Sequence, residues 1–372
     1  ITLSIKSPRV IALSMGGKGD LVQALLALSR LRGEGRSPRL TLVTDSLNHD
    51  AGVWCDLIDN VIARKYRFSL SEIAFNSENP SWSLFKRHPG FFMELKARQF
   101  DLGVVLGPSE EAALFGARFL ELVGAKERIG LIPKGAERLL DRFVTLDLTR
   151  SLPELYKEAV ELAAPFPMAP SVLFPPNDTI VRQADRIMEE AGIKPEAPFV
   201  VINPGAGRYI NLKRWAPERF GEIAGRLRQN FGLPVLVTGG RGDKETIQRM
   251  TENLTPPPFI AAMRSNIAVD AQLIKRSVAC LTNDTVVLHI ALALEIPLLY
   301  CVFGPSAPDN ILPLEHRCRV FQSKRPCVPC EKVKRASQAD PCPIEPVYAC
   351  LADISVDEVW RTMEKDLEKA LA

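Results

Sequence analysis

Hydrophobic and polar positions follow one another along this chain in blocks that predict strands leading into helices. Residues 9–14 form an apolar run of strand length, and after a glycine-rich turn leucines recur every three or four positions, as on one face of a helix. Further runs of strand length lie at 40–45 and 101–107, and a helical pattern covers 109–122. Such alternation is typical of a parallel sheet covered by helices on both faces.

The alternation restarts after a proline-rich segment at 164–178, which cannot continue a helix or a central strand and favours a stiff connector. The pattern beyond it predicts strands at 198–203, 233–240, 278–283 and 297–304, and helices at 179–192, 215–230, 243–253 and 285–294. Because 372 residues also exceed what one core usually organises, we predict two α/β domains, 1–170 and 171–355. The second includes a cysteine-rich loop at 318–350, and a last helix at 356–372 is expected to pack back on the first.

Composition and charge exclude several classes of protein. Hydrophobic residues make up 46% of the chain and charged residues 24%, which is the balance of a folded globular protein. The net charge of +3 is too small for a dedicated nucleic-acid binder, so we expect no nucleic-acid partner. No apolar run approaches the roughly 20 residues that cross a bilayer, and the first residues do not have the order of a signal peptide, so we expect a cytoplasmic location.

Ligands of open α/β sheets bind beyond the carboxyl ends of the strands, which directs attention to three loops. The first contains Lys18, Gly19 and Asp20 and joins the first strand to its helix. In the simplest interpretation the carboxylate of Asp20 only caps the helix. In the functional interpretation it faces a cleft and accepts a proton from a hydroxyl group.

The second loop follows the strand at 198–203 and is rich in small residues and cations. Asn203, Gly205 and Ala206 lie in a tight turn, and Lys213 precedes the next helix, so that backbone N–H groups, a helix N-terminus and a cation could cradle a diphosphate. The alternative is a solvated basic turn with Trp215 as a core anchor.

The third loop begins where the strand at 278–283 ends. Asp284 and Thr285 open a short helix, and His289 lies on the same helical face as Thr285, which favours binding of an anionic group over a purely structural histidine.

In this order the three loops resemble glycosyltransferase family 9, the bacterial heptosyltransferases. The matching motifs are Gly19-Asp20 before an apolar helix, Asn203-Pro204-Gly205-Ala206 with Lys213-Arg214-Trp215, the turn ending in Gly240, and Asn283-Asp284-Thr285 with His289 and Phe303-Gly304-Pro305. The family's glycine after Asp-Ser/Thr is Val286 here, whose β-branched side chain restricts approach of a phosphate to the backbone.

The resemblance implies a GT-B fold, in which two Rossmann-like domains face each other across a cleft, with the acceptor on the N-terminal one and the nucleotide-sugar on the C-terminal one. It implies that Asp20 is the general base of an inverting transfer, and that Asn203, Gly205, Ala206, Lys213, Gly240, Asp284, Thr285 and His289 hold the nucleotide-sugar. Since no Asp-x-Asp occurs in the sequence, we expect no catalytic metal.

The expected reaction is transfer of a heptose from ADP-heptose to a hydroxyl of a bacterial glycoconjugate, the inner core of lipopolysaccharide. Two alternatives keep the enzyme: another nucleotide-sugar as donor, or a protein or small molecule as acceptor. A third alternative is a sugar-nucleotide-binding scaffold without catalysis, which is suggested by Val286 at the position of the family's glycine.

Four cysteines have the paired spacing of a tetrahedral metal site. The set is Cys327, Cys330, Cys342 and Cys350, which predicts a structural zinc, with iron as the alternative metal and four reduced thiols as the alternative without metal. A site with four sulfur ligands leaves no position for substrate, so the metal would not be catalytic.

A group of cations in the N-terminal half is suited to an anionic glycolipid or glycoconjugate acceptor. Arg64, Lys65 and Arg67, together with Lys18 and Gly19, are the expected acceptor-binding residues, if they face the cleft rather than solvent. Contact with a membrane would then be peripheral, at the inner face of the bacterial inner membrane.

Overall fold

The computed structural model describes residues 7–31, 38–55, 58–64, 88–163, 173–175, 177–206, 211–330, 342, 344 and 348–372. The chain divides into two compact units. Unit 1 is Ile1–Pro175 with Leu312–Leu314, and unit 2 is Pro176–Ile311 with Glu315–Ala372. The division falls inside the proline-rich segment at 164–178.

Unit 1 contains a parallel sheet in which the first strand is central. Its strands are β1 (Arg9–Ser14), β2 (Arg39–Asp45), β3 (Ile58–Arg64), β4 (Leu102–Val105), β5 (Glu127–Ile132) and β6 (Arg142–Thr145). Within the described ranges the order is β3-β2-β1-β4-β5-β6, and each neighbouring pair is parallel. The chain therefore reverses direction across the sheet between β1 and β4, and a crevice opens at such a switch point beyond the carboxyl ends of the strands.

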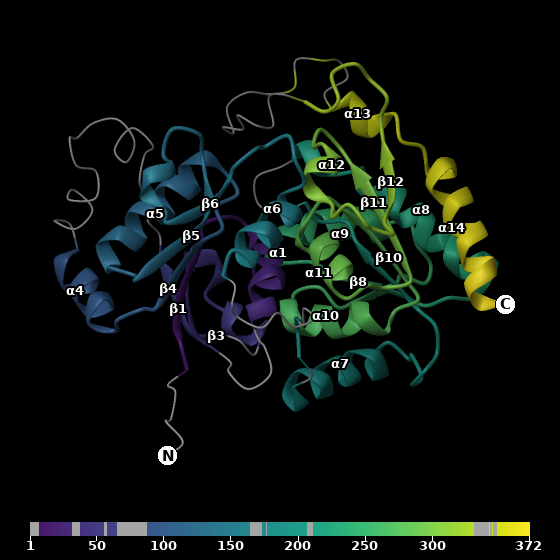
Figure 1. Ribbon diagram of the computed structural model, residues 1–372. Coiled ribbons are helices and arrows are strands. Elements are labelled where there is room, and N and C mark those ends of the chain that lie inside the picture. The colour runs from purple at the N-terminus through teal and green to yellow at the C-terminus, as the bar shows by residue number, and fades with distance from the viewer. Residues whose placement is uncertain are drawn as a thin grey trace. The chain divides into compact units, whose positions relative to one another are not determined.

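Helices of unit 1 pack in pairs on this sheet (Figure 1). They are α1 (Lys18–Leu28), α4 (Pro89–Ala97), α5 (Glu110–Val123) and α6 (Leu152–Glu161). The pair α1 and α6 and the pair α4 and α5 are in contact. Local chemistry sets the ends of α5, because Ser109 caps its N-terminus and Gly124 ends it with a φ of 69°.

Unit 2 repeats the strand order of unit 1. Its strands are β7 (Val200–Asn203), β8 (Val235–Val237), β9 (Phe259–Ile260), β10 (Ala279–Asn283), β11 (Leu298–Phe303) and β12 (Arg319–Gln322). In the described part of this unit the order is β12-β11-β10-β7-β8-β9, again all parallel, so its switch point lies between β7 and β10. Both units therefore have Rossmann-type topology.

The helices of unit 2 are α7 (Asp178–Glu190), α8 (Pro217–Phe231), α9 (Lys244–Thr251), α10 (Ile267–Arg276), α11 (Val286–Ala293), α12 (Pro308–Ile311), α13 (Ala349–Ala352) and α14 (Val356–Leu371). Figure 1 shows α7 beside α10 and α14 beside α8, and both pairs are in contact. None of the helices in the described ranges is long and apolar enough to cross a membrane.

The last helix differs from the expectation that it packs back on the N-terminal domain. Val359, Trp360, Met363 and Leu367 of α14 are buried in the hydrophobic core of unit 2. The apolar stripe correctly indicates a buried face, but an amphipathic pattern does not say which partner covers it.

Candidate active site

Asp20 lies in the first turn of α1, just beyond the carboxyl end of β1. Its side chain is half-buried, and its Oδ2 accepts a hydrogen bond from the N–H of Gly17 at 2.9 Å. The helix-capping interpretation of this carboxylate is therefore correct. Capping of the helix does not prevent this carboxylate from acting as a base, because a carboxylate has about four acceptor positions and the Gly17 N–H uses one of them.

The backbone before α1 approaches this carboxylate closely. A Cβ atom at Gly16 would lie 2.8 Å from Asp20 Oδ2 and 2.9 Å from Cγ of Pro108, so only glycine fits there without displacement. Lys18 Nζ lies 3.5 Å from Asp50 and 5.6 Å from the centre of the Trp54 ring, while Gly19 lies within the first turn of α1. The predicted loop is thus built around the carboxylate of Asp20.

The predicted cation group for the acceptor is largely outside the described residues. Arg64 is the last residue of β3, and the structure describes its backbone only. Lys65 and Arg67 lie outside the described ranges. Their role in binding an anionic acceptor stays a prediction.

Two asparagines mark the switch point of unit 2. Asn203 ends β7 and donates to Oγ1 of Thr238 at 3.2 Å. Asn283 ends β10, donates to the carbonyl oxygens of Pro204 and Gly205 at 3.1 and 2.9 Å, and accepts from the Trp215 N–H at 3.1 Å. The amide of Asn283 therefore holds the turn after β7 and the segment before α8 in one arrangement, which makes it a positioning residue that the sequence motif alone did not assign.

A buried ion pair lies beside this asparagine. Lys213 Nζ pairs with Oδ2 of Asp284, and the side chains are 17% and 4% exposed. A lysine ammonium group has three N–H donors, so the pair leaves donors for the oxygens of a phosphate. Two of the predicted donor-site residues are thus in direct contact.

Thr285 and His289 belong to the helix that starts at this point. The Thr285 hydroxyl accepts from the Val287 N–H at 3.2 Å and caps α11, so the helix forms with Val286 as its first residue. Burial lowers the pKa of His289 to about 4, while the charge of Asp284 acts in the opposite direction. The imidazole is therefore neutral near pH 7, and it can serve an anion as an N–H donor but not as a cation.

Asp243 lies among the predicted donor-site residues, and the sequence motifs did not single it out. Its Oδ2 accepts from the Gly240 N–H at 2.9 Å, and its Oδ1 lies 3.8 Å from the Arg214 guanidinium group. A Cβ atom at Gly205 would lie 2.7 Å from the carboxyl group of Asp243. The turns after β7 and β8 are thus packed against each other through this carboxylate. An Asp three residues after a glycine is a helix-start signal, but its contact with Gly205 is visible only in the fold. Ala206, the last of the predicted turn residues, is buried beside Gly205.

Replacing Gly205 with alanine is expected to displace the Asp243 carboxylate and to separate the two turns. We expect nucleotide affinity to fall about 10-fold and the free energy of unfolding to fall by about 1–3 kcal/mol, the usual cost of overpacking. Calorimetric titration and thermal unfolding measure the two effects. Gly242→Ala is the matched control, because a Cβ at Gly242 would meet no atom within 4 Å. Equal affinities for the two variants would contradict this account of the turn.

The four clustered cysteines are free, half-buried thiols. Burial raises the pKa of Cys350, and the charges of Cys342 and Cys327 raise it further. Nevertheless, among the residues that the structure describes, no three His, Cys, Asp or Glu side chains are grouped closely enough to hold a metal ion. Cys318 is different, because it is buried in the core and its pKa is raised to about 12.

The cysteine-rich loop is hydrogen-bonded to the turn that follows β11. The Cys330 N–H donates to the Pro305 carbonyl at 2.8 Å, and Gln322 donates to the carbonyls of Gly304 and Ser306 at 3.0 and 2.6 Å. The Phe303-Gly304-Pro305 motif is therefore tied to the loop that carries the thiols.

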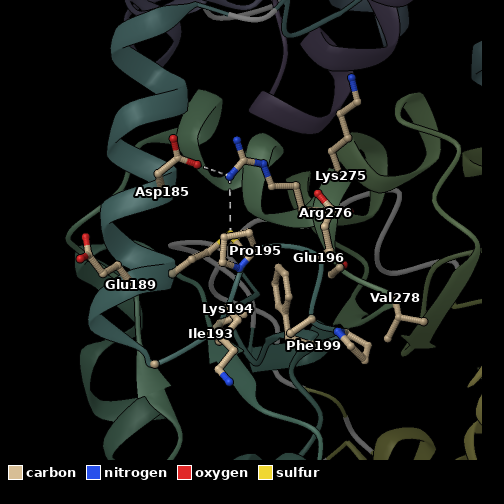
Figure 2. A pocket seen from close by; sticks show the side chains of 15 residues that line it. Asp185, Glu189, Ile193, Lys194, Pro195, Glu196, Phe199, Lys275, Arg276 and Val278 are labelled. Carbon is tan, nitrogen blue, oxygen red and sulfur yellow. Dashed lines mark hydrogen bonds and ion pairs between the residues drawn. The ribbon is translucent and has the colours of Figure 1, made fainter.

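A hollow of about 1060 Å³ opens elsewhere on unit 2, at the amino ends of its strands (Figure 2). Asp185, Phe199 and Arg276 are among its lining residues, and Arg276 is paired with Asp185. None of the predicted site residues whose side chains the structure describes lines it. Since ligands of open α/β sheets bind at the carboxyl ends, we place the candidate site at the switch points and not in this hollow.

The predicted residues thus form two groups. Asp20 and its loop belong to unit 1, and the group around Lys213, Asn283 and Asp284 belongs to unit 2. That the two groups serve one reaction stays a prediction.

The sequence is similar to one protein family and to several curated proteins. Residues 90–339 match glycosyltransferase family 9 (heptosyltransferase). Lipopolysaccharide heptosyltransferase 2 of Salmonella typhimurium is 29% identical over 239 residues, 61% of this chain and 66% of that protein. Lipopolysaccharide heptosyltransferase 1 of Pseudomonas aeruginosa is 25% identical over 329 residues, 87% and 86% of the two chains. The match therefore spans only 66% of the length of the Salmonella relative.

Solved structures show the same fold. A family 9 glycosyltransferase from Veillonella parvula superposes with a TM-score of 0.74 at 19% identity, covering 99% of both chains. The ADP-heptose lipopolysaccharide heptosyltransferase II of E. coli gives a TM-score of 0.70 at 18% identity, with 98% of this chain and 100% of that chain covered. TibC, an iron-containing dodecameric glycosyltransferase of enterotoxigenic E. coli, gives 0.55 at 13% identity, covering 100% and 78%.

The expected fold class, α/β with two Rossmann-like units of the GT-B type, is confirmed by the strand order of each unit and by these structures. The family match covers more than half of the chain and includes the donor-site motifs around Lys213 and Asp284. The chain belongs to glycosyltransferase family 9.

Proposed function

We propose that this protein transfers a heptose from ADP-heptose to a hydroxyl group of a bacterial glycoconjugate, the inner core of lipopolysaccharide. The observation that carries the proposal is the group of Lys213, Asn283 and Asp284 at the switch point of unit 2, in a chain that belongs to family 9. The named activities of the two curated relatives and of the E. coli structure support the choice of sugar and donor.

In the proposed reaction Asp20 takes the proton of the acceptor hydroxyl. The oxygen attacks the anomeric carbon of the heptose from the face opposite the diphosphate, and the bond between that carbon and the diphosphate oxygen breaks. The anomeric configuration is inverted, and ADP leaves with the electron pair. Lys213 and the N-terminus of α11 stabilise the charge that develops on the leaving group, so the step needs no catalytic metal.

A comparison of ligands tests the donor assignment. We expect ADP and ADP-sugars to raise the melting temperature more than the matching uridine and guanosine compounds at equal concentration, since tighter binding to the folded state gives a larger shift. A transfer assay with ADP-heptose and a lipopolysaccharide core acceptor then tests the reaction. A protein that binds ADP and transfers nothing to any acceptor would be a scaffold, and this outcome would contradict the proposal.

We also propose that the four clustered thiols bind a structural zinc or iron ion. Four thiolates are a chemically suitable donor set, and the related fold of TibC is described as iron-containing. Among the described residues, the thiols are not close enough to one another to coordinate one metal ion. Metal binding would therefore have to bring Cys327, Cys330, Cys342 and Cys350 closer together. The ion would order the loop that is tied to the turn after β11, and it would take no part in the transfer.

Elemental analysis of the purified protein is expected to find about one zinc or iron per chain, the stoichiometry of a four-thiolate structural site. The Cys327→Ser, Cys350→Ser double variant should lose the metal, because two of four ligands are removed. Cys318→Ala removes a buried thiol outside the set and should retain it. Metal well below one equivalent in the parent protein would contradict the site.

For the acceptor, we propose an anionic glycolipid that is met at the inner face of the bacterial inner membrane, which places the protein in the cytoplasm. The cations expected to bind it are Lys18, Arg64, Lys65 and Arg67. Membrane contact would be peripheral, through the acceptor and surface charge.

A further inference from the structure

Tyr156 is a buried phenol in unit 1 whose hydroxyl has no hydrogen-bond partner in the described part of the chain. It lies on the inner face of α6 with Leu155, Ala159 and Val160, and its side chain is 0% exposed. A buried polar group without a partner is costly to the folded state. Phenylalanine would fill the same volume without this cost, so packing does not account for the hydroxyl.

The candidate catalytic carboxylate, Asp20, lies close enough to Tyr156 for its charge to act on the phenol. Helix α6 packs against α1, and Asp20 lies in the first turn of α1. Burial raises the pKa of Tyr156 well above its ordinary value, and the negative charge of Asp20 raises it further. The phenol therefore keeps its proton throughout the working pH range, which makes it a potential hydrogen-bond donor near the carboxylate.

The loop between β1 and α1, which leads to Asp20, is surrounded by further buried polar atoms that have no hydrogen-bond partner in the described ranges. They are Oγ of Ser14, Oδ1 of Asn48 and Nε1 of Trp54. Each is connected to the loop between β1 and α1: Ser14 ends β1, the Asn48 amide donates to the Gly16 carbonyl at 3.3 Å, and the Trp54 ring lies beside the ammonium group of Lys18. Native proteins have few such atoms, and their concentration around one loop is typical of a functional site.

We propose that Tyr156 is a positioning residue for Asp20, and that its hydroxyl donates a hydrogen bond to the Asp20 carboxylate when the acceptor is bound. The inference rests on the proposed role of Asp20 as the base. Asp20 receives the proton of the acceptor hydroxyl, and Tyr156 retains its own. A hydrogen bond to the ionised form of a carboxylate lowers its pKa, so Tyr156 keeps Asp20 able to accept a proton and limits its rotation.

The test is Tyr156→Phe, which removes only the hydroxyl. We expect kcat to fall about 10-fold, the usual effect of losing one hydrogen bond to a charged group, with the KM for the donor unchanged. The acidic limb of the kcat profile should move to higher pH by about one unit, because the carboxylate loses a group that stabilises its ionised form. The melting temperature should stay constant or rise, since a buried hydroxyl without a partner has been removed.

Tyr300→Phe in unit 2 is the matched control. The Tyr300 hydroxyl is also buried but donates to Oδ2 of Asp366 at 3.3 Å. This variant should unfold at a lower temperature with the parent kcat and pH profile. Tyr156→Phe with the parent kcat and pH profile would overturn the proposal. A clear fall in its melting temperature, or failure to fold, would overturn it as well, because the hydroxyl would then serve the fold.

A double-variant cycle separates this inference from the proposed function. In an Asp20→Asn background, Tyr156→Phe should cause no further loss of the residual transfer, because Tyr156 acts through the carboxylate. A second, independent 10-fold loss would overturn the positioning role while leaving Asp20 as the base. High activity of Asp20→Asn alone would instead contradict the proposed function.

Discussion

Replacing Asp20 with asparagine is expected to lower the rate of sugar transfer by about 10²- to 10⁴-fold, the usual contribution of a positioned general base. Asparagine is the suitable substitute because its side-chain oxygen can still accept from the Gly17 N–H, so the cap of α1 is retained. The predicted nucleotide site lies in unit 2, so the affinity for ADP should stay constant. Initial rates of transfer and calorimetric titration with ADP measure the two quantities.

Asp45→Asn is the matched control for this experiment. Asp45 ends β2, which is the neighbour of β1 in the sheet, and its side chain accepts from the Leu47 N–H at 2.9 Å. It is therefore a second carboxylate that caps a short helical turn at the same edge of unit 1. We expect the parent rate of transfer for this variant. If Asp20→Asn also retained more than a tenth of the parent rate, Asp20 would not be the base.

The sequence was sufficient to place the loops, because each follows a short apolar strand and contains glycine or asparagine residues. The strand predicted at 9–14 and the helix starts near Pro217 and Val286 agree with the structure within two residues. The family motifs then indicated which loops carry chemistry. These patterns involve residues that are close together in the chain, and such local patterns can be recognised in a single sequence.

The contacts within the site could not be predicted in the same way. The approach of Asp243 to Gly205 and the burial of Tyr156 near Asp20 join segments that are far apart in the chain. The neutral state of His289 depends on how deeply α11 is buried, which its composition does not fix. Each of these features decides how a group behaves in the reaction, and each is a property of the packing of the elements.

Replacing Lys213 with methionine is expected to damage both the fold of unit 2 and its affinity for nucleotide. The substitution leaves the carboxylate of Asp284, which is 4% exposed, without its cation. Breaking a buried ion pair in this way costs about 3–5 kcal/mol of the free energy of unfolding. The loss of a charged donor to the diphosphate should also raise the Kd for ADP about 10- to 100-fold. Chemical denaturation and titration with ADP measure the two effects.

The double variant Lys213→Met, Asp284→Asn separates stability from binding. Removing the second charge abolishes the uncompensated carboxylate, so most of the lost stability should return, while ADP affinity should stay low because the cation is still missing. Lys275→Met is the matched control, since Lys275 is exposed at the hollow of Figure 2 and should change neither quantity. Parent affinity for ADP in the double variant would show that Lys213 serves only the fold, and the diphosphate would then have to be held by the backbone and the N-terminus of α11.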